Sequence, residues 1–331
     1  MLEHGGRLRR ASAVYGIALE RWLDLSTGIN PRPWAGEPTP LTLWHRLPED
    51  EDGLAQTAQE YYGAPGVLPT AGSQAAILNL PRLRAPCRVG VLSPGYAEHA
   101  ARWREAGHEV VPVTPAECPD AAATLDVLTL INPNNPTGHR FTRTQLLRWH
   151  GEITARGGWL IVDETFADTD PAESVAAETH REGLVVLKSL GKFFGLAGAR
   201  VGFVLAAEPL REGLAERLGP WTIAGPSRAI AAGALNDRRW QNETRRRLRA
   251  DATRLAALMR ASGLAPSGGC ELFQWVVTAR ASRIHERLAR GGILCRLFDA
   301  PGSLRFGLPG TEEDWRRLET ALPAAVDEAS P

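Results

Sequence analysis

Short apolar runs alternate with helix-like segments between residues 70 and 225. The apolar runs are continuous rather than alternating, as is typical of strands buried on both faces of a sheet. They cover residues 88–93, 126–131, 158–163, 183–189 and 200–206. Segments 97–107 and 142–158 lie between these runs, show helical spacing and end in glycine. This alternation predicts an α/β domain with a mostly parallel sheet flanked by helices.

A different pattern begins at Pro226, where a long helical stretch runs to about residue 263. The segments after it alternate as strand, helix, strand and helix over 272–279, 282–292, 303–309 and 311–322. They predict a smaller α+β domain. A proline-rich segment, 30–40, indicates an extended connection near the N-terminus. We therefore expect an N-terminal arm and connection (1–40), a large α/β domain (41–225) and a small C-terminal domain (226–331).

The overall charge gives no sign of a nucleic-acid or membrane partner, because 38 acidic residues balance 38 Lys and Arg. The N-terminal residues lack the apolar core of a signal peptide, and the longest apolar runs are far shorter than the ~20 residues of a transmembrane helix. The four cysteines form no CxxC pair, which favours free thiols and a cytoplasmic protein. The histidines show no ligand spacing, so we predict no metal site.

Lysine occurs at only two positions, Lys188 and Lys192, in the segment KSLGKFFGLAGARVGF. The other 36 of the 38 basic residues are arginines. An amine can lose its proton and form a Schiff base with a carbonyl, whereas a guanidinium stays charged. Two surface lysines retained by chance are the alternative, but the surrounding glycines and apolar residues indicate a shaped pocket.

Several further features lie where loops at the carboxyl ends of parallel strands carry ligands. The glycine-rich start of a helix at 72–74 suits a phosphate, although a plain helix cap would look the same. Asp163 ends a strand and could keep a pyridine nitrogen protonated, or could simply cap a turn. The turn NPNNPTG (132–138) presents amide side chains, and Tyr96 could stack on a flat ring or merely pack. Together these features describe a site for pyridoxal phosphate.

The same residues, in the order Gly72–Gln74, Tyr96, Asn135, Asp163, Ser189-x-x-Lys192 and Arg200, resemble the class I/II aminotransferases with the pyridoxal phosphate fold type I. The resemblance implies that Lys192 binds the cofactor as a Schiff base, that Asp163 pairs with the pyridine nitrogen and that Tyr96 covers the ring. It implies a hydrogen bond from Asn135 to the ring oxygen O3′, and binding of the substrate α-carboxylate by Arg305. It assigns the cofactor phosphate to Gly72, Ser73, Gln74, Ser189 and Arg200. Lys188 has no such counterpart, and we interpret it as structural.

A narrower resemblance is to the threonine-phosphate decarboxylases of cobalamin biosynthesis, which are related to histidinol-phosphate aminotransferase. It rests on HGG (4–6), DLSTGINP (24–31), GPWTIAGPSRAIAAGAL (219–235) and ILCRLFDAPGSLRFGLP (293–309). It implies a homodimer and an amino-acid phosphate as the substrate. The chain departs from its relatives at four positions. Leu47 and Phe166 stand where they often have Tyr, Gly28 stands where they often have Asn, and Gly191 replaces a common Ser or Thr.

The shared motifs leave the reaction open, because decarboxylation and amino transfer use the same cofactor residues. The anchor for the far end of the substrate decides between them, and a phosphate there is a dianion near neutral pH. The candidate anchors are Arg296, His4, Gly5 and Gly6. We predict decarboxylation of L-threonine O-3-phosphate. The alternatives are a histidinol-phosphate-type aminotransferase and a non-catalytic protein that retains the fold.

Overall fold

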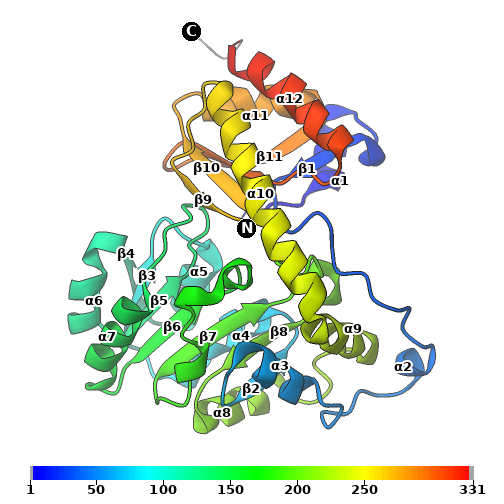
Figure 1. Ribbon diagram of the computed structural model, residues 1–331. Helices are drawn as coiled ribbons and strands as arrows, with labels where there is room; N and C mark the ends of the chain where they lie inside the picture. Colours follow the sequence, from blue (N-terminus) through cyan, green and yellow to red (C-terminus); the bar gives the residue numbers. More distant parts are fainter. Residues whose placement is uncertain (1–2, 328–331) are drawn as a thin grey trace. The chain divides into compact units, whose positions relative to one another are not determined.

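The computed structural model describes residues 3–327, which divide into two compact units (Figure 1). The larger unit comprises Pro33–Asn135 and His139–Asn242, and the smaller unit comprises the remaining described residues. Within the described residues no helix is both long and apolar enough to cross a membrane.

The larger unit is built on a seven-stranded sheet. Strand β8 (Gly202–Leu205) runs in the opposite direction to the other six strands of this sheet. The strands follow the order β2 (Val67–Thr70), β8 (Gly202–Leu205), β7 (Leu184–Ser189), β6 (Trp159–Asp163), β5 (Val127–Ile131), β3 (Arg88–Leu92) and β4 (Glu109–Val113). The predicted mostly parallel α/β sheet is confirmed, and each of the five predicted strands is present. Strands β2 and β4 were not predicted, because prolines at 69 and 112 interrupt their apolar pattern.

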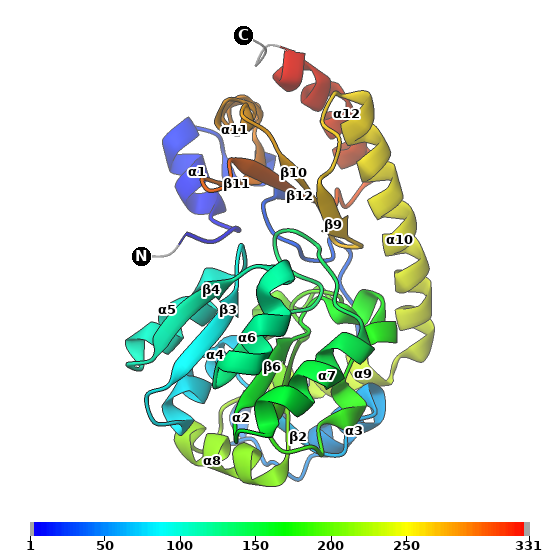
Figure 2. The same ribbon diagram turned by 90° about the vertical axis from the view of Figure 1, so that its left-hand side faces the viewer.

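Helices cover this sheet on both faces. Buried residues of α4, α5 and α8 share one apolar cluster with Val127, Ile161, Leu187 and Val204 of the strands. Helices α6 and α7 lie against β5 and β6 on the near side in Figure 2. The helices of the unit are α2 (Thr42–His45), α3 (Leu54–Tyr62), α4 (Ser73–Asn79), α5 (Ala97–Glu105), α6 (Cys118–Thr124), α7 (Arg143–Thr154), α8 (Glu208–Leu218) and α9 (Gly225–Asn236).

The smaller unit contains a five-stranded sheet in the order β1 (Leu23–Leu25), β11 (Ile293–Phe298), β12 (Ser303–Gly307), β10 (Phe273–Val277) and β9 (Gly268–Cys270). β1 runs parallel to β11, and the other neighbours are antiparallel. Its helices are α1 (Leu8–Tyr15), α11 (Ala281–Arg290), α12 (Glu312–Asp327) and most of α10 (Arg238–Ala261). The predicted α+β character of this part is confirmed.

The unit boundaries differ from the predicted ones at 40 and 225. Residues before Pro33 belong to the smaller unit, because β1 pairs with β11 there. The larger unit continues to Asn242, because α9 lies against α3. The predicted long helix after Pro226 is interrupted at Asp237, whose carboxylate accepts hydrogen bonds from the Trp240 backbone (2.9 Å) and the Trp34 indole (3.1 Å). An aspartate at such a position favours a new helix start.

Candidate active site

Asp163 ends β6 and is buried beside a histidine that the sequence analysis did not identify. His99 Nε2 lies 2.9 Å from Asp163 Oδ2, and the Thr165 backbone N–H donates to Oδ1 at 3.0 Å. Because a carboxylate only accepts, His99 must donate from Nε2 in this pair. His99 stands three residues after Tyr96 at the start of α5, and this i, i+3 spacing places both on one helix face. This spacing is the one feature of the sequence that could have indicated His99 as a site residue.

A tight cradle forms where α4 begins beside β8. A Cβ atom at Gly202 would lie 2.4 Å from the Ser73 backbone nitrogen, and one at Gly72 would lie 2.8 Å from Arg200 Nη2. Arg200 adopts a left-handed backbone conformation, with φ of 54°. Ser189 pairs with Gly202 across the sheet. The first N–H groups of a helix have no partner within the helix, so this cradle offers N–H groups, a hydroxyl and a guanidinium to an anion.

Gln74 and Tyr96 connect the cradle to Asp163. The Tyr96 hydroxyl donates to Gln74 Oε1 at 3.2 Å, and the Tyr96 and His99 rings meet edge to face with centroids 6.1 Å apart. Burial raises the pKa of Tyr96 to about 12, and the carboxylates of Glu98 and Asp163 act in the same direction. Tyr96 is therefore a neutral hydrogen-bond donor at physiological pH.

Lys192 lies in the loop after β7, with Nζ 5.4 Å from the centre of the Phe166 ring. Phe166 follows Asp163 by three residues, so this contact brings Lys192 close to the end of β6. Asn135 lies in the loop after β5 and is partly buried. All nine residues predicted for the cofactor thus lie in the larger unit, at the ends of β5, β6 and β7 or at the starts of α4, α5 and β8.

Lys188 has entirely different surroundings from Lys192. Its Nζ is buried and lies 2.7 Å from Glu164 Oε2 and 3.7 Å from Asp168 Oδ1.

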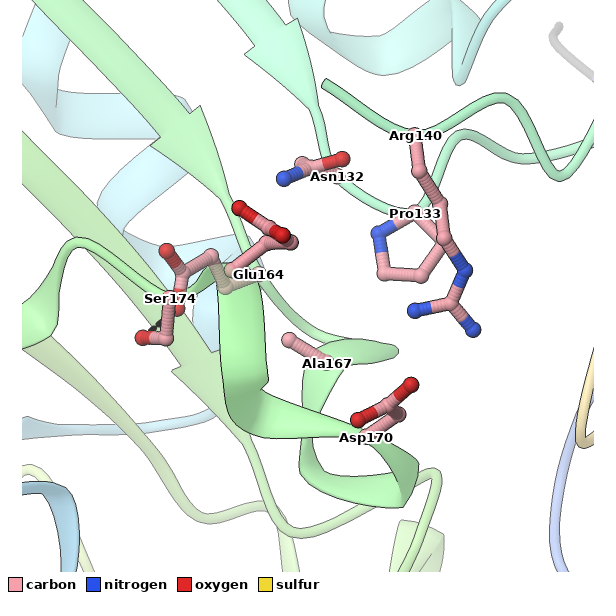
Figure 3. Close-up of a pocket in the computed structure, with 8 residues that line it drawn as sticks. Asn132, Pro133, Arg140, Glu164, Ala167, Asp170 and Ser174 are labelled. Atoms are coloured by element: carbon pink, nitrogen blue, oxygen red, sulfur yellow. Dashed lines mark hydrogen bonds between the residues drawn. The ribbon is translucent and has the colours of Figure 1, made fainter. Parts of the chain in front are cut away.

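A small pocket borders Glu164 beyond the ends of β5 and β6 (Figure 3). It is lined by Asn132, Pro133, Arg140, Glu164, Ala167, Asp170, Glu173 and Ser174. None of these lining residues was predicted to bind the cofactor, so this pocket is not the predicted site.

The residues predicted to bind the substrate lie in the smaller unit, where three of them meet at Ser26. Arg305 Nη2 donates to the Ser26 carbonyl oxygen at 2.8 Å, and the Gly6 N–H donates to Ser26 Oγ at 2.7 Å. A Cβ atom at Gly5 would lie 2.3 Å from the same carbonyl oxygen. Burial, and then the charge of Arg296, lower the pKa of Arg305 to about 10. Arg305 therefore remains a buried cation at neutral pH.

Arg296 stands directly opposite Arg305 on the neighbouring strand. Its Nη2 donates to the Glu3 carbonyl oxygen at 2.7 Å, and its Nη1 lies 3.9 Å from the Glu3 carboxylate. His4 follows Glu3 and is partly buried. All five predicted substrate residues thus come together in one part of the smaller unit, although the sequence places them almost 300 residues apart. Like charges directly opposite each other on a sheet are unfavourable, so such a pair suits an anionic ligand.

The family model for aminotransferase class I and II matches residues 44–322. The chain belongs to this family. The resemblance drawn from the lysine motif is therefore confirmed. Among individual family members, the chain is 55% identical to the threonine-phosphate decarboxylase of Pseudomonas aeruginosa over 97% of each chain. It is 42% identical to that of a Sinorhizobium species, over 96% of this chain and 97% of that protein.

A solved family structure also matches almost the whole chain. It is the histidinol-phosphate aminotransferase of Sinorhizobium meliloti in complex with pyridoxal-5′-phosphate, with a TM-score of 0.84. The match covers 99% of this chain and 96% of that one at 19% sequence identity, so it supports the fold alone.

Proposed function

We propose that this protein is a pyridoxal phosphate-dependent decarboxylase of L-threonine O-3-phosphate, with 1-aminopropan-2-ol O-2-phosphate as the product, in cobalamin biosynthesis. The observation that carries the proposal is the pair of facing arginines, Arg296 and Arg305, gathered with the N-terminal glycines. A substrate with a carboxylate and a phosphate needs two cationic contacts. The 55% identical relative bears the name of this enzyme.

The residues of the larger unit suit the proposed cofactor. Gly72 and Gly202 lack the Cβ atoms that would collide with Arg200 and with the start of α4, so these parts of the chain can approach closely. We assign the cofactor phosphate to this cradle, with Ser189 and Arg200, and the pyridine nitrogen to Asp163. When bound, pyridoxal phosphate supplies an aldehyde for an amine and a ring that accepts the electrons released when a bond to Cα breaks.

Each remaining side chain has one task in the proposal. Lys192 provides the amine that binds the cofactor, and the Phe166 ring lies beside its Nζ. His99 orients the Asp163 carboxylate by donating a hydrogen bond to it. Asn135 bonds the ring oxygen, since Phe166 has no hydroxyl to donate. Tyr96 covers the ring face, oriented by its hydrogen bond to Gln74.

The substrate-binding part of the proposal concerns the smaller unit. Arg305 binds the α-carboxylate, since its guanidinium is buried and is oriented by its hydrogen bond to the Ser26 carbonyl oxygen. Arg296, with His4 and the N–H groups of Gly5 and Gly6, binds the phosphate. With both anionic ends held, the scissile Cα–carboxylate bond has one orientation, which is what selects decarboxylation over loss of the Cα proton.

We also propose a cytoplasmic homodimer. Leu41, Trp44 and Leu47 are large apolar residues around α2 with exposed fractions of 81%, 66% and 65%. Such a patch is typical of a protein–protein interface. The four cysteines are free, which agrees with a reducing compartment.

The deciding experiment measures carbon dioxide release from threonine phosphate and from threonine, with amino transfer to 2-oxoglutarate measured in parallel. Wild-type protein should decarboxylate the phosphorylated substrate far faster. Truncating one partner of a desolvated charge pair costs ~2–5 kcal/mol, so Arg296→Ala should reduce kcat/KM by about 30-fold to several thousand-fold. The loss should be much smaller with threonine, because the lost contact is to the phosphate.

Arg290→Ala is the matched control, because this arginine is exposed on α11 of the same unit and pairs only locally with Glu286. It should leave kcat/KM unchanged. Equal losses on both substrates would show that Arg296 does not bind the phosphate. Efficient amino transfer with little carbon dioxide release would favour the aminotransferase alternative instead.

A further inference from the structure

The ends of β6 and β7 carry charged residues on both faces of the sheet. Asp163 pairs in register with Leu187, so Ser189 shares a face with Asp163. Glu164 follows Asp163 and Lys188 follows Leu187, so these two residues lie on the opposite face of the sheet. The same register places Glu164 and Lys188 side by side, and the Glu164 N–H donates to the Leu187 carbonyl oxygen at 2.9 Å.

We propose that the buried Lys188–Glu164 ion pair is a positioning device for the cofactor, which sets the spacing between Asp163 and Ser189. The inference rests on the proposed function, in which Asp163 binds the pyridine nitrogen and Ser189 the phosphate. Lys188 and Glu164 touch neither group. They act through the backbone, because each is bonded covalently to one of the two residues that do.

The contacts of this pair are unusually complete. Lys188 Nζ lies 2.7 Å from Glu164 Oε2, 3.7 Å from Asp168 and 4.9 Å from the centre of the Tyr62 ring. Glu164 also accepts a hydrogen bond from the Val175 N–H at 2.9 Å. Ser174 Oγ donates another to Glu164 at 2.5 Å (Figure 3). The pair therefore ties β6 and β7 to α3 and to the segment after β6, with the side chains of Lys188 and Glu164 both fully buried.

Stability alone does not explain an ion pair at this place. Removing two charges from water is costly, and apolar residues of similar size often give equal or better stability. An ion pair with fixed hydrogen bonds instead specifies one arrangement, because a slip of either strand would leave a buried charge without its partner. Burial by itself lowers the pKa of Lys188, but Glu164 and Asp168 outweigh it and raise the pKa above its usual value. Lys188 therefore stays protonated at neutral pH.

The test measures cofactor binding by three variants, Glu164→Gln, Lys188→Met and the double variant Lys188→Met/Glu164→Gln. Glu164→Gln retains the shape and the acceptor oxygen, and the double variant removes both charges of the pair while Asp168 remains. The readouts are the dissociation constant of pyridoxal phosphate from the apoprotein, and the pH midpoint at which the visible absorbance of the Lys192-bound cofactor changes. Neither readout requires the substrate.

We expect Glu164→Gln and the double variant to bind pyridoxal phosphate about tenfold or more weakly, with a displaced pH midpoint, while circular dichroism remains native. Leu160→Ala is the control for lost stability, because Leu160 is buried at the opposite end of β6. It should lower the melting temperature but leave the dissociation constant within about twofold and the midpoint unchanged.

Native cofactor affinity and midpoint in Glu164→Gln and the double variant would overturn the proposal, even if Lys188→Met alone failed to fold. Equal weakening in Leu160→Ala would overturn it too, because the effect would then follow stability. Failure of the wild-type protein to bind pyridoxal phosphate would instead refute the proposed function.

Discussion

At the scale of single residues, the two lysines separate into an accessible amine and a buried structural charge. Lys192 lies beside an aromatic ring at the end of the sheet, whereas Lys188 lies between two carboxylates. Glu164 and Asp168 raise the pKa of Lys188 despite its burial, so this amine is protonated at neutral pH and is no nucleophile. Both residues are lysines, so their surroundings decide which of the two amines is reactive.

We predict that Lys192→Ala abolishes turnover and the visible absorbance of bound pyridoxal phosphate, because no other accessible lysine can bind the aldehyde. Borohydride reduction of the wild-type protein followed by peptide mapping should locate the label on Lys192. A label on Lys188 would contradict both the assignment and the buried ion pair.

His99 provides a second prediction at this scale. His99→Ala should leave the buried Asp163 carboxylate without its donor, at a penalty of about 1–3 kcal/mol. This corresponds to a loss of about 5-fold to 160-fold in kcat. His99→Gln, which can still donate a hydrogen bond, should recover part of it. Full activity of the alanine variant, measured by carbon dioxide release, would show that Asp163 does not depend on His99.

At the scale of elements, the cradle depends on the close approach of β8 to the start of α4. We predict that Gly202→Ala forces these elements apart, because the added Cβ would lie 2.4 Å from the Ser73 nitrogen and 2.6 Å from the Gly72 carbonyl carbon. Such overpacking costs ~1–3 kcal/mol. The variant should melt at a lower temperature and bind pyridoxal phosphate about tenfold more weakly.

Gly198→Ala is the control for this prediction, because a Cβ at Gly198 would have no neighbour within 4 Å. It lies in the short 3-10 helix Ala197–Ala199, just before Arg200. Its melting temperature and cofactor affinity should match those of the wild type. If Gly202→Ala behaves the same way, β8 and α4 do not need to be this close for cofactor binding.

At the scale of the whole molecule, the exposed apolar residues around α2 predict self-association. Replacing a central interface aromatic often costs 2 kcal/mol or more, so Trp44→Glu should weaken a dimer by about 30-fold or more. Sedimentation velocity over a range of concentrations would measure the change. Val14→Glu alters an equally exposed residue (67%) on α1 of the smaller unit and should leave association unchanged. A wild-type monomer at all concentrations would contradict the proposed dimer.

The sequence by itself determined the elements with strong local signals. Continuous apolar runs between glycine-ended helices were sufficient for the parallel core strands β3, β5, β6 and β7, because strands buried on both faces leave that pattern. The pattern from Ser189 to Lys192 and Arg200 indicated the family by resemblance, and the family model confirms it. β1 has only three residues and β2 contains a proline, so neither shows a hydrophobic pattern from which a strand could be predicted.

Only the tertiary structure decided which distant residues meet. His99 reaches Asp163 across 64 positions of the chain, and Arg296 reaches Glu3 across 293. No local pattern encodes these contacts, because they follow from strand order and register, which depend on the packing of the whole sheet. The same holds for Lys188: it lies only four positions before Lys192, but strand register places it beside Glu164, in a buried ion pair.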